Sequence, residues 1–252
     1  MATTRVAAQM LGKLPVRTDT RTLSLARYVD GARLPSPPAS FDETSGIDNW
    51  PMYANDRIGD CTTAAAAHMI EAWTTLGRGH AIELSERAVL DAFNDVKLID
   101  PFTGEEGAVE LDVLRYWRAN GIGGHRIGAY ARVGRHDQRL VQTAAWLFCG
   151  LYVGLQMPVT AHAQQVWDWT GSLAGPARPG SWGGHAVDVV GYDRNGLTVV
   201  TWGRLQELTW SFWDRYCDEA YCILSDDFLK EGQAPSGFDL AALEADLALV
   251  TA

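Results

Sequence analysis

The sequence predicts an α+β fold in which a helical region precedes a β-rich region. Between about residues 61 and 123, apolar side chains recur at helical spacing, and Gly121 ends the last helix of the run. From residue 125 onward, runs of β-branched and aromatic residues between turn signals predict strands. The 252 residues, 47% of them hydrophobic, suffice for the core of one domain or of two closely packed lobes.

The pattern divides the chain into three parts. Residues 1–44 show little periodicity beyond a short helix at 23–29 and a proline-rich extended stretch, so we expect an N-terminal arm. Residues 45–230 form the main domain, with a helical lobe at about 45–124 and a β-rich lobe at about 125–230. Residues 231–252 are expected to form a linker and a short amphipathic helix that docks on the body or meets another subunit.

Three helices are expected in the helical lobe. The first follows Gly59 and Asp60, which break and cap it, and its alanine run carries Met69, Ile70 and Trp73 on one face. The second covers residues 85–96 and the third covers residues 110–120, with a loop at 98–107 between them. The loop carries Glu105 and Glu106, which favour a solvated turn; a preference for basic substrates is the lesser alternative.

The β-rich lobe is predicted to begin with a further helix at 135–150 and a strand at 151–159. Two strands at 185–192 and 197–202 follow, joined by a turn at 193–196. Tryptophans crowd the loop before them, at Trp167, Trp169 and Trp182. We expect these side chains chiefly to close the core of the lobe, with a cleft wall as the alternative.

Cys61 is the main candidate for a catalytic residue, because it lies at the expected start of the first helix. Unpaired N–H groups and the positive end of the helix dipole both favour a thiolate there. A reactive cysteine needs a base, and His185 opens a strand after two glycines. A histidine at a strand mouth that meets a cysteine at a helix mouth is the arrangement for thiolate catalysis.

These motifs resemble the papain-like cysteine peptidases in their order along the chain. Asn55 lies six residues before Cys61 where the family has Gln-x5-Cys; His185 begins His-Ala-Val…Gly-Tyr; and Trp202 precedes a glycine as in Asn-Ser-Trp-Gly. The Leu-Ser-Glu stretch from Leu84 and the glycine-containing loop from Gly107 are also similar, so the resemblance spans about residues 34–224. It implies a helical lobe packed on an antiparallel β-barrel-like lobe, in a divergent bacterial or phage member.

The resemblance also implies roles for individual residues. Cys61 would be the nucleophile, His185 the base, and the Asn55 amide with the Cys61 backbone N–H the oxyanion hole. Gly107 and Ala108 would approach the backbone of a bound peptide, and Trp202 would shield the histidine. Trp182 is a further candidate for substrate binding, and residues 219–228 would supply the final strand of the barrel.

Three departures from the family pattern bear on activity. Asn55 is one methylene shorter than the family's glutamine. The asparagine that orients the histidine is absent: one alignment puts Val200 there and the other puts Thr201, which would serve through a single hydrogen bond. Asp60 places a carboxylate beside the thiol, which opposes thiolate formation unless the side chain turns away to cap the helix.

Composition limits the partners. The net charge of −10 and the lack of a Lys/Arg cluster argue against nucleic acid, and no apolar stretch is long enough to cross a membrane or to act as a signal core. No cofactor fingerprint or metal-ligand spacing is present. We expect a cytoplasmic protein, or a virion-associated one if phage-encoded, with the arm or the C-terminal helix as a possible contact for an assembly partner.

The four cysteines lack the density of a disulfide scaffold, and Ile58 stands where secreted members of the family carry a partner cysteine. Cys149, Cys217 and Cys222 are expected to be buried apolar residues. The arm is also too short for the family's long inhibitory propeptide, so a zymogen is not expected.

The leading hypothesis is a thiol-dependent hydrolase that cleaves peptide or isopeptide bonds in a peptide or protein substrate. Two alternatives remain open at this point. A weakened papain-like protein would keep the fold for a structural role in a larger assembly such as a phage particle. A cysteine-dependent amidase or acyl transferase would apply the same chemistry to another acyl compound.

Overall fold

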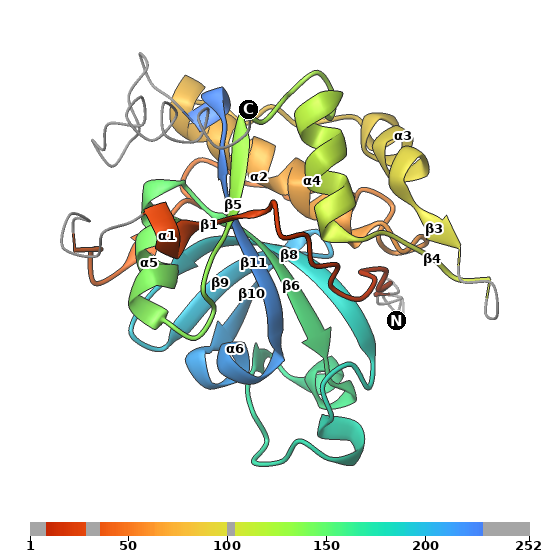
Figure 1. Cartoon of the computed structure of the whole chain (residues 1–252), viewed down its shortest axis with the longest axis vertical. Helices are drawn as coiled ribbons and strands as arrows, with labels where there is room; N and C mark the ends of the chain where they lie inside the picture. The colour runs from red at the N-terminus through yellow and green to blue at the C-terminus, as the bar shows by residue number, and fades with distance from the viewer. Residues whose placement is uncertain (1–8, 29–35, 100–103, 229–252) are drawn as a thin grey trace, which may run out of the picture.

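The computed structural model describes residues 9–28, 36–99 and 104–228 (Figure 1). The C-terminal helix expected at 238–250 lies outside these residues. No helix in the described part of the chain is long and apolar enough to span a membrane.

Three helices gather on one side of the molecule, as Figure 1 shows. Helix α2 (Cys61–Arg78) is followed by α3 (Glu86–Val96) and α4 (Glu110–Ala119). Between α3 and α4, strands β3 (Leu98–Ile99) and β4 (Glu106–Gly107) form a short hairpin, where the sequence predicts a loop. The helical lobe predicted from the apolar periodicity is therefore present with all three of its helices.

A mostly antiparallel sheet of nine strands forms the other side of the described structure, in the order β1-β5-β11-β6-β8-β9-β10-β7, with β2 beside β8. Its central strands are β11 (Cys217–Leu224), β6 (Leu151–Met157), β8 (Gly183–Tyr192) and β9 (Gly196–Thr201). Flanking them are β5 (Ala129–Arg132), β10 (Arg204–Thr209) and β7 (Val166–Trp167). The predicted α+β class is confirmed.

Two short strands and a helix come from the predicted N-terminal arm. Strand β1 (Leu23–Ser24) pairs with β5, and β2 (Phe41–Asp42) pairs with β8. Helix α1 (Leu25–Tyr28) follows β1 where the sequence predicts a helix at 23–29. Helix α5 (Gln138–Leu147) also matches its prediction, whereas α6 (Trp210–Tyr216) and strands β5 and β10 were not predicted.

Helix α2 packs against strand β8, and this contact positions Cys61 at the start of the helix relative to His185 near the start of the strand. The alanine run from Ala64 to Ala67 lets the helix approach the sheet closely, because these small side chains are almost completely buried. Trp73 fills the far end of the interface, where it stacks on Trp117 of α4 with 5.5 Å between ring centroids. The start of α2 is thereby held beside the start of β8.

The remaining cysteines match the sequence prediction. Cys149, Cys217 and Cys222 are free thiols buried in the core. Burial raises the pKa of each of them, so they are expected to be unreactive.

Candidate active site

Cys61 is the first residue of α2 and is 1% exposed. Its Sγ accepts a hydrogen bond from the backbone N–H of Ala186 on β8, at 3.4 Å. Because Ala186 follows His185 directly, the packing of α2 on β8 brings the thiol and the histidine into one site. The two residues singled out from the sequence, 124 positions apart in the chain, therefore lie on neighbouring segments, with Sγ of Cys61 bonded to the residue that follows His185.

His185 is held by two residues of the following strand and turn. Its Nε2 lies 2.5 Å from Oγ1 of Thr201, the last residue of β9. The ring of Trp202 stacks on the imidazole, with centroids 4.3 Å apart and planes at 14°. Nδ1 of His185 has no hydrogen-bond partner among the described residues, so this nitrogen remains available for a proton.

Burial keeps both groups neutral in this form. Desolvation raises the pKa of Cys61 to about 12, although the nearby N–H groups of Ala186 and Gly12 act in the opposite direction. Desolvation also lowers the pKa of His185 to about 3. The site as described therefore holds a thiol and a neutral imidazole, without a thiolate–imidazolium pair.

Asp60 does not cap α2 through its side chain, contrary to one expectation from the sequence. It occupies the N-cap position, but its carboxyl group is buried and forms no capping hydrogen bond. Burial raises the pKa of Asp60 to about 8, despite the opposing effect of the neighbouring Asn55 amide. A protonated Asp60 carries no charge, so at neutral pH it opposes the thiolate less than the sequence suggests.

The Asn55 amide lies in the loop that leads to the cysteine. Its Nδ2 donates one hydrogen bond to the carbonyl of Ile58 at 3.1 Å, and the amide also interacts with the carboxyl group of Asp60. The backbone N–H of Cys61 is also without an intrahelical partner, because it is the first residue of its helix. Two donors suited to an oxyanion are thus present on one loop.

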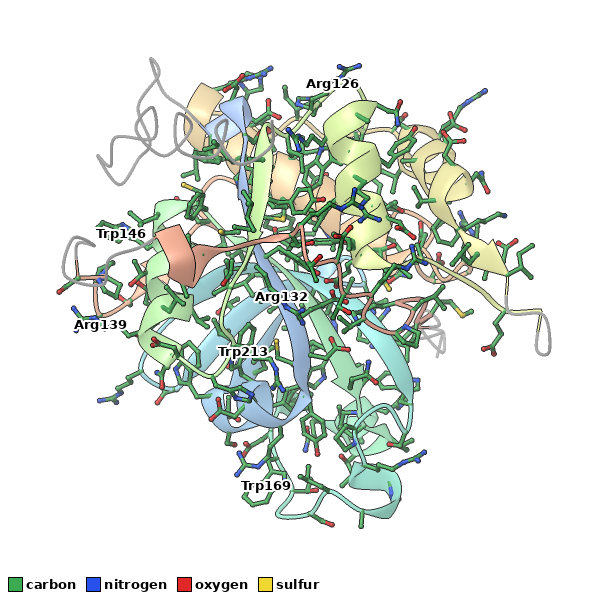
Figure 2. The ribbon with its side chains drawn as sticks, viewed as in Figure 1. Arg126, Arg132, Arg139, Trp146, Trp169 and Trp213 are labelled. Carbon is green, nitrogen blue, oxygen red and sulfur yellow. The ribbon has the colours of Figure 1, made fainter. Side chains whose placement is uncertain are left out.

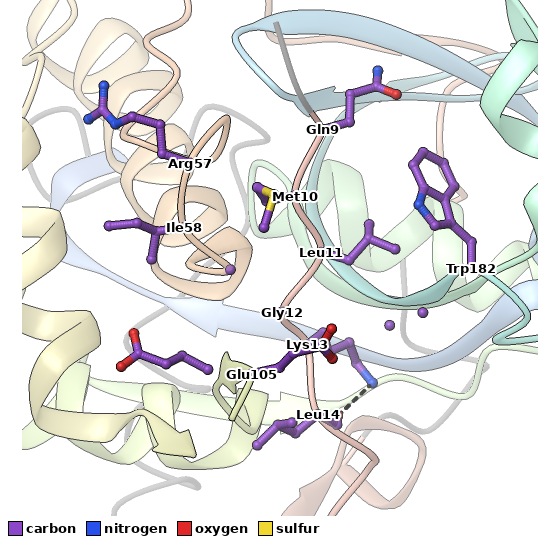
Figure 3. A pocket seen from close by; sticks show the side chains of 14 residues that line it. Gln9, Met10, Leu11, Gly12, Lys13, Leu14, Arg57, Ile58, Glu105 and Trp182 are labelled. Carbon is purple, nitrogen blue, oxygen red and sulfur yellow. Dashed lines mark hydrogen bonds between the residues drawn. The ribbon is translucent and has the colours of Figure 1, made fainter. Parts of the chain in front are cut away.

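Residues 10–14, hereafter the strap, pass directly over this site. Figure 3 shows the segment running between Arg57 and Ile58 on one side and Trp182 on the other. Met10 is fixed at both of its backbone groups, since its N–H donates to the carbonyl of Asn55 at 3.1 Å and its carbonyl accepts from Nε1 of Trp202 at 3.0 Å. The strap therefore contacts the loop of Asn55 and the tryptophan that covers His185.

The rest of the strap is hydrogen-bonded to both walls of the cleft. The carbonyl of Gly12 accepts from the N–H of Ala108 at 2.9 Å, and the N–H of Leu14 donates to the carbonyl of Ala108 at 2.9 Å. Lys13 and Ala108 thus form a parallel bridge. On the opposite wall, the carbonyl of Gly184 accepts from the N–H groups of Gly12 and Lys13 at 3.3 and 3.1 Å.

Glycines make the close approach of the strap possible. A Cβ atom on Gly12 would lie 1.7 Å from the carbonyl oxygen of Gly59. A Cβ on Gly107 would lie 2.4 Å from the carbonyl oxygen of Gly12, and one on Gly184 would lie 2.2 Å from that of Lys13. Since all these contacts are with backbone atoms, no side chain can be added without moving the strap.

An open pocket of about 490 Å³ flanks the strap. It is lined by the strap itself and by Arg57, Ile58, Glu105, Trp182 and Gly184, which Figure 3 shows in part. A segment of extended peptide therefore already occupies the space between the two lobes, with solvent-filled volume beside it.

Comparison with known proteins gives matches in structure alone. No protein-family model and no curated protein sequence matches the chain. Xylellain, a cysteine protease from Xylella fastidiosa, is similar with a TM-score of 0.64 at 16% identity, over 89% of this chain and 99% of that one. Procathepsin B S9 from Trypanosoma congolense gives 0.59 at 13% identity, over 86% of this chain and 87% of that one. Bromelain from Ananas comosus gives 0.51 at 16% identity, over 75% of this chain and 100% of that one.

The fold is that of the papain-like cysteine proteases. At these identities the likeness establishes the fold and leaves the activity to be argued from the site. The fold predicted from the order of the motifs is confirmed, with Cys61 on the helical side of the papain-like cleft and His185 on the sheet side.

The structure distinguishes between the two alignments for the residue that orients the histidine. Thr201 contacts His185, whereas Val200 packs in a separate apolar cluster with Trp50, Ala72 and Val190. Of these two residues, Thr201 is therefore the one whose side chain reaches His185.

Of the predicted substrate-binding residues, Trp182 lines the pocket, and Gly107, Ala108 and Trp202 lie against the strap. Gly107 and Ala108 approach the strap backbone, and Trp202 covers His185. Trp182 lines the pocket and packs on Trp202 with centroids 5.6 Å apart. Of the other two tryptophans, Trp167 is buried in the core and Trp169 lies at the lower end of the view in Figure 2, where the guanidinium of Arg215 on α6 lies 3.7 Å from its ring centroid.

The strap was not predicted from the sequence. Residues 10–14 carry no helical or strand periodicity and lie in a segment assigned to a lead-in arm. Gly12 was a possible signal, because an isolated glycine can mark a close backbone approach, but a single glycine is not specific.

Proposed function

We propose that the protein is a thiol-dependent hydrolase that cleaves peptide or isopeptide bonds with Cys61 and His185. The observation that carries the proposal is the arrangement of the two residues. Cys61 begins α2 with its Sγ on the backbone N–H of Ala186, and His185 is fixed next to it by Thr201 and Trp202. The unpartnered Nδ1 of His185 is the nitrogen that would accept the thiol proton.

The reaction proceeds in two halves. Sγ of Cys61 bonds to the carbonyl carbon while Nδ1 of His185 takes the thiol proton, and the carbonyl π electrons move to oxygen. The tetrahedral intermediate collapses, the C–N bond breaks, and His185 returns the proton to the leaving amine. Water then attacks the thioester with His185 as base, which releases the acid and restores the thiol.

Two donors support the oxyanion. They are the backbone N–H of Cys61, which has no partner within its helix, and the amide of Asn55, which would exchange its contacts with Ile58 and Asp60 for the oxyanion. Thr201 acts through His185, because its hydroxyl fixes the ring plane and so directs Nδ1. The hydroxyl provides weaker orientation than an amide, which predicts a modest rate.

The strap has to leave before a substrate can enter. It covers Cys61 and uses the hydrogen-bonding groups of Ala108 and Gly184 that an extended peptide would use. Water and polar groups then reach the site, which removes the cause of the raised pKa of Cys61 and the lowered pKa of His185. We therefore propose that the covered form is a resting state.

Hydrolysis of a fluorescent casein by the full chain tests this function. We expect little cleavage by the wild type, measurable cleavage by Gly12→Ala, in which the strap is displaced, and none by Gly12→Ala/Cys61→Ala. No cleavage by Gly12→Ala, with Cys61 alkylated no faster than a free cysteine, would favour a structural role instead. Release of product only when a small amine is added would indicate an acyl transferase.

A further inference from the structure

Lys13 is the strap residue whose side chain enters the body of the protein. Its side chain is fully buried, and its Nζ lies 2.9 Å from Oδ2 of Asp218 and 3.0 Å from Oε1 of Glu219. Both partners belong to β11, so the lysine reaches across from the strap to the centre of the sheet. Burial of an ammonium is costly unless opposite charges compensate it, and here they do.

A third carboxyl group, that of Glu110, belongs to the buried space that the Lys13 side chain occupies with Asp218 and Glu219, hereafter the recess. Glu110 begins α4, two residues after the strap-binding Ala108, and is completely buried. Both of its carboxyl oxygens lack a hydrogen-bond partner among the described residues, although its charge interacts with that of Lys13. One ammonium therefore faces three acidic side chains, and both carboxyl oxygens of Glu110 and Oδ1 of Asp218 have no hydrogen-bond partner among the described residues.

The recess is built to keep this arrangement. The hydroxyl of Tyr221 donates to Oε2 of Glu219 at 2.7 Å, and Nε2 of Gln156 donates to Oδ2 of Asp218 at 2.6 Å. Space for the lysine exists because residue 154 on β6 is a glycine; a Cβ on Gly154 would lie 2.1 Å from Cε of Lys13. Both the charges and the shape of the recess are thus matched to a long cationic side chain.

We propose that this recess is the specificity pocket of the enzyme and binds a Lys or Arg side chain of the substrate, with Lys13 occupying it in the resting state. The inference rests on the proposed function, because it names the substrate class of the same cleft. The substrate residue concerned is the one whose backbone pairs with Ala108, since Lys13 pairs there now. Arginine suits the recess as well as lysine, because its five donors would also reach the unpartnered Glu110.

The recess does not include the acidic pair noted in the sequence, Glu105 and Glu106, which line the open pocket beside the strap. Glu106 is engaged by Lys97, whose Nζ lies 2.7 Å from its Oε1 in a partly exposed pair on the β3–β4 hairpin. The acidic residues that matter come instead from α4 and β11, far apart in the chain.

Binding of matched peptides to an open form of the full chain tests the proposal without requiring turnover. The open form is Gly12→Ala/Lys13→Ala, which moves the strap and empties the recess. The probes are the hexapeptide Gln-Met-Leu-Gly-Lys-Leu, copied from residues 9–14, and its analogue with norleucine for lysine. Norleucine keeps the aliphatic stem and lacks the ammonium, so the pair isolates the charge.

Isothermal titration calorimetry should show the lysine peptide binding about 10-fold to 100-fold more tightly than the norleucine peptide, the range expected for a buried charged contact. An arginine analogue should also bind more tightly than norleucine. Adding Glu219→Gln to the open form should reduce the difference, whereas adding Lys97→Ala should leave it unchanged. Equal binding of the lysine and norleucine peptides, or binding of neither, would overturn the proposal.

The two proposals fail separately. Selective binding of the lysine peptide by a protein that hydrolyses no casein would keep the pocket and refute the hydrolase. Casein hydrolysis together with equal binding of the lysine and norleucine peptides would support the hydrolase function and refute the specificity pocket. If circular dichroism shows that the double variant does not fold, the same titrations with Gly12→Ala alone decide the question.

Discussion

A single methyl group at position 12 should open the cleft. In Gly12→Ala the new Cβ would lie 1.7 Å from the carbonyl oxygen of Gly59, 2.3 Å from its carbonyl carbon and 2.6 Å from its Cα. These are backbone atoms next to the start of α2, so the mobile partner is the strap. We expect the strap to leave the cleft while the remainder of the fold stays in place.

The size of the effect follows from the hydrogen bonds that keep Gly12 in position. Three backbone bonds depend on it: Gly12 N–H to Gly184, Ala108 N–H to Gly12, and Lys13 N–H to Gly184, at 3.3, 2.9 and 3.1 Å. At about 1 kcal/mol net each, their loss costs the covered form about 3 kcal/mol. Each 1.4 kcal/mol is a factor of about ten, so the open fraction should rise about a hundredfold.

Alkylation of Cys61 by iodoacetamide at a fixed pH of about 8, followed by mass spectrometry, measures that fraction, because the covered thiol is 1% exposed. Gly134→Ala is the matched control, since a Cβ there would meet only Cδ2 of Leu140 at an ordinary 3.6 Å. If Gly12→Ala is labelled at the rate of the wild type and of Gly134→Ala, the strap does not control access and the reasoning is refuted.

Three further predictions concern the site and the strap. Thr201→Val should lower kcat about tenfold to a hundredfold at similar KM in the Gly12→Ala background, because the imidazole of His185 loses the one hydrogen bond that it forms with the described residues. Thr201→Ser should retain most of the rate, and equal rates for Val and Ser would contradict this reasoning. Lys13→Met should accelerate Cys61 alkylation whereas Lys97→Met should not, since the Lys13 pairs are buried and the Lys97 pair is partly exposed. Burial raises the pKa of Asp60 to about 8 in the folded protein, while an exposed aspartate titrates near about 3.9. Between those pH values the Asp60 carboxyl group is ionised in the unfolded state and protonated in the folded state. The stability of the wild type therefore falls with rising pH across that window and levels off above it. In urea unfolding, the free energy of unfolding of Asp60→Asn should therefore rise relative to that of the wild type between about pH 5 and 8. A difference in free energy of unfolding that stays constant with pH would argue against a protonated Asp60.

The sequence predicted the positions of Cys61 and His185 because the signals for both are local. A helix start after Gly59 and Asp60, and a strand after two glycines, each depend on neighbouring residues, and the packing of α2 on β8 follows from their apolar faces. Thr201 was reachable for the same reason, as the last residue of the strand after His185.

The strap and the recess of Lys13 were beyond sequence reasoning. The recess joins residues from the strap, the start of α4 and strand β11, separated by as many as 206 positions from Lys13 to Glu219, and buried charges have no periodicity that predicts their partners. The strap is held mainly by backbone hydrogen bonds, which depend on geometry and very little on residue type. The glycines along the strap's path are its one visible feature in the sequence, and the close backbone contacts that require them can be recognised only from the structure.

The most direct test of the account is the pH dependence of Cys61 alkylation in Gly12→Ala, compared with Gly12→Ala/His185→Ala. With the strap displaced, we expect fast labelling already at about pH 6 that is lost when the imidazole is removed, because a thiolate–imidazolium pair then forms. Labelling that rises only near the ordinary thiol pKa of about 8.5 in both proteins would contradict the account, since Cys61 would then have no base.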